Sequence, residues 1–163
     1  MNIFYLSKSP DIAAQLQPDK MLVKMILESA QMLCTAHRVL DGDEYADEVG
    51  LYKIAYKNHP CTIWTRECSG NYWWLYKHFL ALGREYEYRY KRTHLSIGKL
   101  ADALYTMPEN ITRGLMTPVA QAMPDEYKHE NPITAYRNYV VNEKHYAKWS
   151  NGRTKPSWWE ASQ

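Results

Sequence analysis

One helical run in the sequence, DKMLVKMILESAQMLCTAHR, has a single narrow polar stripe. At about 100° per residue, its polar side chains fall within a sector of roughly 80°. The stripe comprises Lys20, Lys24, Glu28, Gln31, Thr35 and Arg38. A carboxylate flanked by cations is suited to proton transfer, with Glu28 as the acid or base and with Lys24 and Arg38 binding an anion or adjusting the proton affinity of a neighbour. The alternative is a solvent-facing seam with an ordinary i, i+4 ion pair between Lys24 and Glu28.

Two other groups of side chains have the chemistry to contact nucleic acid. The segment KNHPCTIWTRE combines cations with an amide and an imidazole, at Lys57, Asn58, His59 and Arg66. The last third of the chain interleaves cations with aromatic rings: Tyr127, Lys128, Arg137, Lys144, Lys148, Trp149, Trp158 and Trp159. Cations that bind phosphate, placed among rings that stack on bases, favour a DNA-binding surface. The alternatives are a structural loop for the first group and tryptophans that close the core for the second.

The sequence offers little that could hold a metal ion or a cofactor. A zinc site could be drawn from Cys34, His37, His59, Cys61 and Cys68, but there is no paired C-x-x-C, and Cys34 lies within the apolar face of its helix. The seven glycines are scattered, so no Gly-rich phosphate loop is present. No Ser/His/Asp set can be identified from spacing. We therefore predict neither a metal ion nor a cofactor.

The elements that must position these side chains are helices. Apolar residues follow helical spacing from 19 to about 40, and an aromatic-rich helix is predicted from about 71 to 92. Shorter helices are predicted over 11–16, 96–106 and from Asn131, where an N-cap precedes proline, to about Trp149. No alternating strand pattern exceeds four residues. The sequence thus predicts an all-α fold, a compact single-domain helical bundle over residues 1–163 with a buried central helix and an irregular aromatic C-terminal tail.

Composition sets the broad class of the protein. The chain has 163 residues, of which 45% are hydrophobic, enough to bury one core. A net charge of +2 does not demand a polyanionic partner. The aromatic residues are 14 Tyr and 6 Trp against only 2 Phe, and rings that carry a polar group suit hydrated surfaces on which bases can stack. Three cysteines are too few and odd in number for a secreted disulfide framework, and no run approaches the length of a membrane span. We expect a soluble cytoplasmic protein without a membrane partner.

Three blocks of the sequence, taken in order, resemble the pyrimidine-dimer DNA glycosylase family of the endonuclease V type. DKMLVKMILE has an acidic residue opening a helix and a glutamate nine positions later, like the catalytic helix of that family. WLYKHFLALGREYEYRY is similar to its long second helix. MPDEYK, followed by Arg137, Lys144 and KPSWW, is similar to its basic loop, last helix and aromatic tail. Together the blocks cover a little over half of the chain.

The resemblance implies a DNA-acting enzyme that uses no metal ion or cofactor. In this family the N-terminal α-amine attacks C1′ of a damaged nucleotide and forms an imine, and a helical glutamate moves protons so that strand cleavage follows base loss. Carried over to this chain, Glu28 takes the role of the glutamate, and the amine belongs to Met1 or, if the initiator is removed, to Asn2. Retention of Met1 is expected to leave the amine one residue too far out.

The sequence departs from the family pattern at several positions, which keeps other functions open. Ile3 and Phe4 stand where the family has an arginine near its terminus, Met21 where it has a histidine, and Gln31 where it has an arginine one turn beyond the glutamate. The alternative is a non-catalytic relative that binds a nucleotide, a modified base or a partner protein in the same cleft. A third possibility is a structural or inhibitory protein that docks through its Tyr and Trp side chains.

Overall fold

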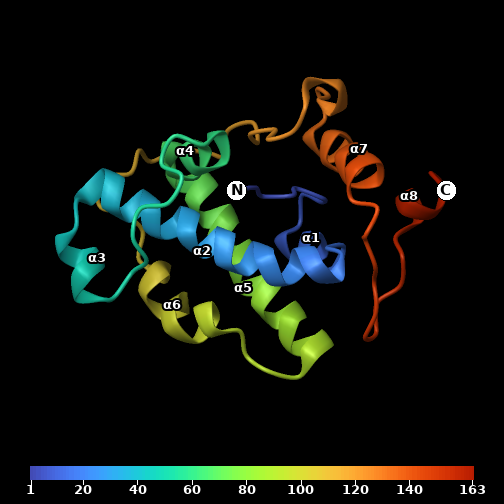
Figure 1. Cartoon of the computed structure of the whole chain (residues 1–163). Helices are drawn as coiled ribbons and strands as arrows, with labels where there is room; N and C mark the ends of the chain where they lie inside the picture. Colours follow the sequence, from blue (N-terminus) through green and yellow to red (C-terminus); the bar gives the residue numbers. More distant parts are fainter.

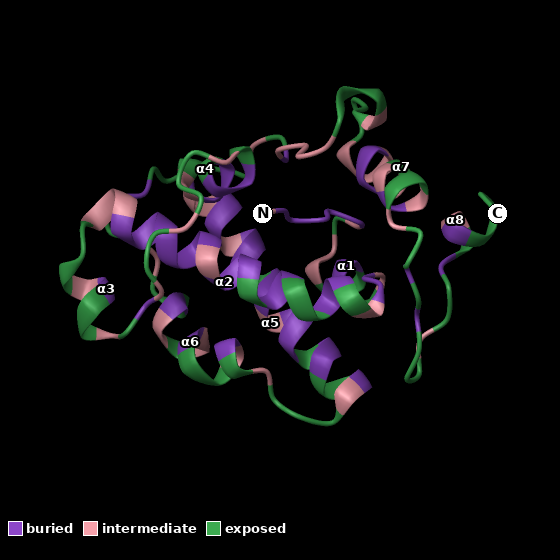
Figure 2. Ribbon diagram, in the orientation of Figure 1, coloured by how far each residue is buried: buried purple, intermediate pink, exposed green.

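Two long helices form the centre of the computed structural model, which describes all 163 residues. Helix α2 (Asp19–Asp41) and helix α5 (Ser69–Tyr90) cross and pack against each other (Figure 1). Both helices are buried along much of their length, as the purple segments in Figure 2 show. Leu22 and Ile26 of α2 and Phe79 of α5 are fully buried in a hydrophobic core of 36 residues. A helix that is apolar on most sides has to be packed on most sides, and α2 meets this requirement.

Shorter helices surround the central pair. They are α1 (Pro10–Gln15), α3 (Glu44–Glu48), α4 (Pro60–Glu67), α6 (Leu95–Tyr105), a 3₁₀ turn (Asp125–Tyr127), α7 (Pro132–Glu143) and α8 (Ser157–Glu160). Helices α4 and α6 pack on both α2 and α5, and α1 packs on α5. Helix α7 lies over the N-terminal segment (Figure 1). None of the eight α-helices combines the length and the hydrophobicity that crossing a membrane requires.

Local sequence explains where three of the helices begin. A side-chain acceptor precedes a proline at the start of α1, α4 and α7. Ser9, His59 and Asn131 accept hydrogen bonds from backbone N–H groups of the first turn, which would otherwise have no partner. Proline suits the first helical position because its missing N–H would be unpaired there in any case.

The C-terminal tail is held against the central helices by polar contacts. The Trp149 indole donates a hydrogen bond to the Leu16 carbonyl at 2.8 Å, and the Lys148 carbonyl accepts from Asp19 N–H at the same distance. Arg153 donates to both carboxylate oxygens of Glu85 at 2.7 and 2.9 Å. These contacts place the tail against the end of α1, the start of α2 and the C-terminal part of α5.

The all-α prediction is confirmed, and its bounds differ in instructive places. The central helix was predicted to within one residue, and α5 begins and ends two residues before its predicted limits. Two short helices are not among those predicted from the sequence: α4, within the segment for which a structural loop was the alternative, and α3, in the acidic stretch that follows α2. Helix α7 ends at Glu143 and does not continue to Trp149, because residues 144–150 leave the helix to make the tail contacts.

Candidate active site

A pocket of about 370 Å³ lies beside the N-terminal half of α2. Its walls come from three parts of the chain: the N-terminal segment, α2, and α7 with the residues that follow it. The pocket is lined by Met1, Asn2, Phe4, Lys20, Met21, Lys24, Met25, Glu28, Tyr139, Lys144 and Tyr146. One carboxylate, three ammonium groups, three aromatic rings and the α-amine of the chain therefore meet at one place.

The α-amine of Met1 lies directly on the carboxylate of Glu28. The amine nitrogen is 3.2 Å from Glu28 Oε1, and Glu28 is only 7% exposed. The other oxygen, Oε2, accepts no hydrogen bond from the protein, and the Lys24 ammonium is 3.8 Å from it. A buried carboxylate needs a charged partner to offset the loss of hydration. The amine supplies that charge at Oε1, which leaves Oε2 able to accept a proton or a hydrogen bond from a ligand.

The side chain of Asn2 directs the amine toward Glu28. Asn2 Oδ1 accepts hydrogen bonds from the backbone N–H groups of Ile3 at 2.7 Å and Phe4 at 3.1 Å, and its Nδ2 donates to the Ala122 carbonyl at 2.9 Å. Phe4 has a φ of +50°, in the left-handed region that side chains larger than glycine rarely adopt. Strained backbone persists only where its surroundings hold it. Here the asparagine turn and the buried Phe4 ring hold the first residues in one conformation.

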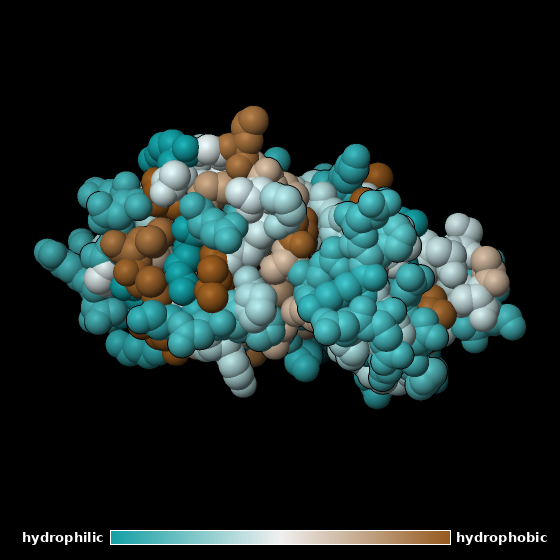
Figure 3. All heavy atoms as spheres, turned by 90° about the horizontal axis from the view of Figure 1, so that it is seen from above, coloured by the Kyte–Doolittle hydropathy of each residue, from teal (hydrophilic) through white to brown (hydrophobic).

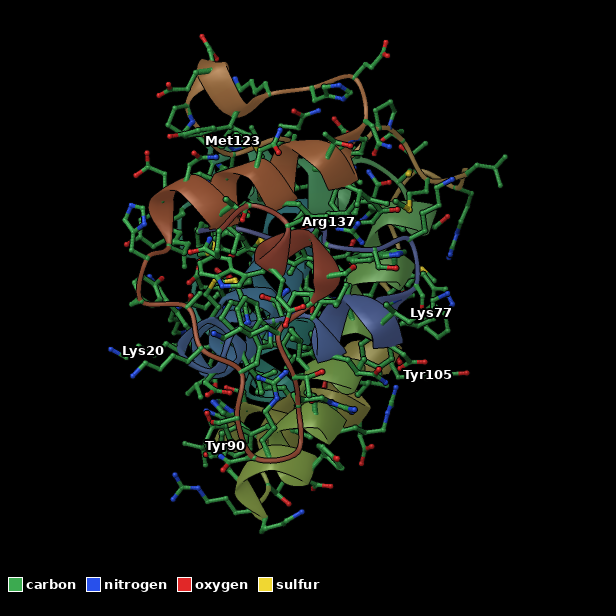
Figure 4. The ribbon with its side chains drawn as sticks, turned by 90° about the vertical axis from the view of Figure 1, so that its right-hand side faces the viewer. Lys20, Lys77, Tyr90, Tyr105, Met123 and Arg137 are labelled. Carbon is green, nitrogen blue, oxygen red and sulfur yellow. The ribbon has the colours of Figure 1, made fainter.

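Aromatic rings and lysines form the outer part of the pocket. The Phe4 and Tyr139 rings are stacked with their centroids 5.9 Å apart. Lys144 Nζ lies 4.7 Å from the centroid of Tyr139, and Lys20 Nζ lies 5.6 Å from that of Tyr146. Lys20 extends outward at the edge of the molecule in Figure 4. Ammonium groups beside aromatic rings can bind phosphate and a flat base at the same time.

His59 lies close enough to the Met1 amine and the Glu28 carboxylate for their charges to affect its pKa. Burial lowers the pKa of His59 and the nearby α-amine lowers it further, while the Glu28 carboxylate raises it, with a net decrease. The ring is therefore neutral at neutral pH. Its Nδ1 accepts from the Cys61 backbone N–H at 3.1 Å, so the proton of the neutral ring belongs to Nε2.

The structure brings together five of the residues predicted from the sequence, namely Met1, Asn2, Lys24, Glu28 and Lys144. The expectation that a retained Met1 leaves the amine one residue too far out is wrong, because the N-terminal segment passes close over α2 and the amine of Met1 itself reaches Glu28. Four residues that line the pocket, one lysine and three aromatic residues, were not predicted as site residues from the sequence: Lys20, Phe4, Tyr139 and Tyr146. Only Lys20 gave a signal, since it precedes Lys24 by one turn on the polar stripe.

The C-terminal half of the polar stripe does not face the pocket. Arg38 is 5% exposed, and its guanidinium donates to the carboxylates of Asp43 at 2.8 Å and Asp47 at 2.9 Å and to the Leu51 and Tyr52 carbonyls. Arg38 therefore fastens the segment after α2 and has no role at the pocket. Gln31 is half-buried and also lies outside the pocket.

The segment before α4 is organised by its own contacts. Arg66 donates to the Lys57 carbonyl at 2.8 Å, which closes the turn that precedes the helix. Lys57 and Asn58 are exposed and lie outside the pocket. Of this predicted group, only His59 is close to the Met1 amine.

Most of the predicted C-terminal contacts with DNA are engaged within the protein. Tyr127 donates to Glu143 at 2.6 Å, and Lys128 pairs with Asp125 at 2.8 Å. Arg137, a residue of α7, lies on the side of that helix next to α8 (Figure 4), where it donates to the Leu6 carbonyl at 3.0 Å and lies over the Trp158 ring. Trp149 and Trp159 are buried. Trp149 and Trp159 therefore close the hydrophobic core, which is the alternative given above for the tryptophans.

The three cysteines are buried and unbridged, and no three His, Cys, Asp or Glu side chains are grouped as metal ligands. Burial raises the pKa of the Cys34 and Cys61 thiols to about 11. The outer surface is largely hydrophilic, with hydrophobic side chains exposed in separate patches on the face in Figure 3.

Comparison with known proteins bears on the part of the chain that forms most of this site. A family model described as pyrimidine dimer DNA glycosylase matches residues 1–97. The matched range is more than half of the chain and runs from Met1 through α2 and α5, so it contains the amine and Glu28. No curated protein and no solved structure matches the chain.

Proposed function

The chain belongs to the pyrimidine dimer DNA glycosylase family, and we propose that it removes damaged or modified pyrimidines from DNA and then cleaves the strand as an AP lyase. The observation that carries the proposal is the contact of 3.2 Å between the Met1 amine and Glu28 Oε1. An amine beside a carboxylate that can take its proton is an activated nucleophile. Imine formation of this kind requires no metal ion.

The proposed reaction begins with proton transfer from the Met1 ammonium to Glu28. The neutral amine attacks C1′ of the damaged nucleotide, the C1′–N bond breaks, and the base leaves with the electron pair and takes up a proton. The C1′–O4′ bond then breaks, O4′ takes up a proton lost by the nitrogen, and the imine between Met1 and C1′ forms. Loss of a C2′ proton then expels the 3′ phosphate, and water hydrolyses the imine to regenerate the amine. The target atoms lie inside a base stack, so the nucleotide has to leave the stack first.

Each part of the pocket has a task in this scheme. Glu28 accepts the proton of the amine at Oε1 and passes it to the departing base, after which the carboxylate can accept the C2′ proton of the sugar at Oε2. Lys20, Lys24 and Lys144 are placed to bind the phosphates on either side of the target nucleotide. The stacked Phe4 and Tyr139 rings offer a flat apolar wall for a base.

A second candidate is a non-catalytic relative that binds a nucleotide, a modified base or a partner protein in the same pocket. One observation favours it: Gln31 stands where the resemblance leads us to expect an arginine one turn beyond Glu28, and its side chain does not line the pocket. A protein of this kind would bind its ligand without forming an imine.

Borohydride trapping separates the two candidates. The full chain, with Met1 verified as its first residue by intact mass, is mixed with UV-irradiated duplex DNA or with a duplex holding one abasic site, and the mixture is reduced. We expect a covalent protein–DNA adduct, located at Met1 by peptide mass spectrometry. A folded protein that gives no adduct on either substrate but still binds the DNA is the non-catalytic relative.

The variant Glu28→Gln tests the role of the carboxylate. The amide keeps the size of the side chain and an acceptor for the amine but cannot take its proton, so cleavage should be abolished while helicity and DNA affinity stay within about threefold of wild type. The matched control is Glu130→Gln, because Glu130 is exposed, forms no ion pair and lies outside the pocket. Cleavage by Glu28→Gln within a few-fold of wild type would refute the assignment.

A further inference from the structure

Four large hydrophobic residues are exposed on α2 and on the segment between α3 and α4. Val23 and Leu27 lie one turn apart on α2, and they are 38% and 41% exposed. Ile54 and Tyr56 belong to the segment that leads into α4, and they are 48% and 68% exposed. We call these four residues the apolar strip. Exposed large side chains that lie near one another can mark a surface that binds a partner.

The segment that carries Ile54 and Tyr56 is fixed to α2. It runs alongside that helix on its way to α4 (Figure 1). The Thr35 hydroxyl donates to the Ala55 carbonyl at 3.4 Å and accepts from the Ala55 N–H at 3.1 Å. Successive side chains of an extended chain point to opposite sides. Half-buried Ala55 therefore lies toward α2, and its two neighbours face the solvent.

Tyr56 opens a tight turn that presents its ring to the solvent. Its φ is +48°, in the left-handed region that a bulky side chain rarely adopts. The Tyr56 carbonyl accepts from the His59 N–H at 3.0 Å, and Arg66 closes the turn by donating to the Lys57 carbonyl at 2.8 Å. Strained backbone persists where its surroundings hold it, and it gathers at functional sites. The most exposed ring of the apolar strip thus projects from a fixed backbone.

The charges beside the apolar strip are positive. Lys57 follows Tyr56 in the turn, and Lys20 and Lys24 lie on the same exposed stretch of α2 as the strip; all three lysines are exposed. Lys20 and Lys24 also line the pocket that holds the Met1 amine, so the strip and the pocket share a border. An apolar surface edged with ammonium groups matches DNA, which offers stacking bases between anionic phosphates.

The spacing between the Tyr56 ring and the amine fits one short stretch of duplex. His59, three residues after Tyr56, is near enough to the Met1 amine and Glu28 for both charges to act on its ring. Thr35, which anchors the segment, is seven positions from Glu28, or about 10 Å along the helix. That length is about three base steps of 3.4 Å. A nucleotide in the pocket and a base beside Tyr56 can therefore belong to the same few base pairs.

Resting on the proposed removal of pyrimidines from DNA, we propose that the Tyr56 ring inserts into the duplex and fills the gap left by the nucleotide that turns into the pocket. Extrusion costs the stacking on both faces of the target base. A side chain inserted at the vacated place recovers part of that loss. The other members of the strip, Val23, Leu27 and Ile54, then lie against the bases and sugars beside the gap, and Lys57 lies against a phosphate.

Insertion can be measured without the reaction. The probe is a duplex in which tetrahydrofuran replaces one nucleotide, so that no imine can form, and in which the neighbouring base is 2-aminopurine, whose fluorescence falls when a ring stacks on it. We expect the full chain and Tyr56→Phe to lower the fluorescence on binding, and Tyr56→Ala to bind without lowering it. The matched control is Tyr105→Ala, because Tyr105 is 64% exposed and lies at the opposite edge of the molecule from Lys20 in Figure 4.

Single-turnover cleavage supplies a second measurement. On a duplex with one abasic site, Tyr56→Ala should react at least about tenfold more slowly than the wild type, because a base stacked on an aromatic side chain contributes roughly five- to 150-fold. Tyr56→Phe should restore the rate. On a single strand with the same site there is no gap to fill, so Tyr56→Ala and the wild type should agree within about twofold. An equal loss on both substrates would give Tyr56 a role in the pocket or the fold and would overturn the proposal.

The proposal is also overturned if the wild type leaves the 2-aminopurine fluorescence unchanged, or if Tyr56→Ala lowers it and cleaves the duplex as the wild type does. A wild-type dimer in sedimentation that Tyr56→Ala dissociates would make the apolar strip an interface between two copies, which contradicts insertion. A wild-type chain that cleaves neither substrate contradicts the proposed function instead, and the fluorescence of the uncleavable duplex then still decides whether the ring inserts.

Discussion

Removing a single residue from the N-terminus should eliminate imine formation. The chain can be released from a cleavable tag so that it begins at Asn2, which moves the amine back by one residue, or about 3.8 Å. The Met1 amine is 3.2 Å from Glu28 Oε1 in the structure, so the new amine would lie beyond contact with the carboxylate. Reacting atoms have to approach to about 3–3.5 Å, and a misplacement of 1 Å can cost roughly 100-fold in rate. We expect a loss of at least about 100-fold, equivalent to about 2.7 kcal/mol in the barrier.

The assay is single-turnover cleavage of a duplex with one abasic site, which bypasses base removal and therefore reports on the imine steps alone. Circular dichroism and fluorescence anisotropy check that the shortened chain is folded and binds DNA as the full chain does. A matched extension, glycine added before Met1, turns the Met1 amine into an amide nitrogen and should be similarly inactive. Cleavage by the chain that begins at Asn2 within threefold of the full chain would refute the reasoning, because the nucleophile would then not be the amine held on Glu28.

Three further predictions follow from individual contacts. Lys144→Gln should weaken DNA binding uniformly across sequences and reduce its dependence on salt concentration by about one phosphate contact, as anisotropy at several salt concentrations will show. Burial raises the pKa of Glu85, but the hydrogen bonds and charges of Arg153 and Arg89 lower it by more, so the pKa in the folded protein is below the ordinary value. The stabilisation of the folded state by this carboxylate is therefore present at neutral pH and is lost as the pH falls through the folded pKa. Glu85→Gln should therefore lower the free energy of unfolding at pH 7 by about 3 kcal/mol and flatten its acid dependence in urea titrations. Arg38→Ala should lower the free energy of unfolding by roughly 2 kcal/mol, because it removes the donor to the Leu51 and Tyr52 carbonyls, and should leave the rate of cleavage by the folded protein unchanged.

Several features of the fold could be predicted because they depend on neighbours along the chain. The period of the apolar residues identified α2 to within one residue, and Asn131 followed by Pro132 marked the start of α7. The end of α7 was not predictable in this way. Residues 144–150 have no local signal that stops a helix, and they leave it because Lys148 and Trp149 form hydrogen bonds with Asp19 and Leu16, more than 120 positions away.

The candidate site shows the same division between local and distant determinants. Lys24 and Glu28 are four residues apart on a helix, so the sequence by itself determines that their side chains are neighbours, just as it determines the all-helical architecture. Only the tertiary structure decides what they face. The amine reaches Glu28 because Asn2 is bonded to Ala122, Tyr139 joins the pocket because it stacks on Phe4, and Arg38 leaves it because Asp43 and Asp47 bind its guanidinium. Contacts of this kind follow from the packing of the whole chain and from the requirement that buried polar groups find partners, and neither can be read from the helical period.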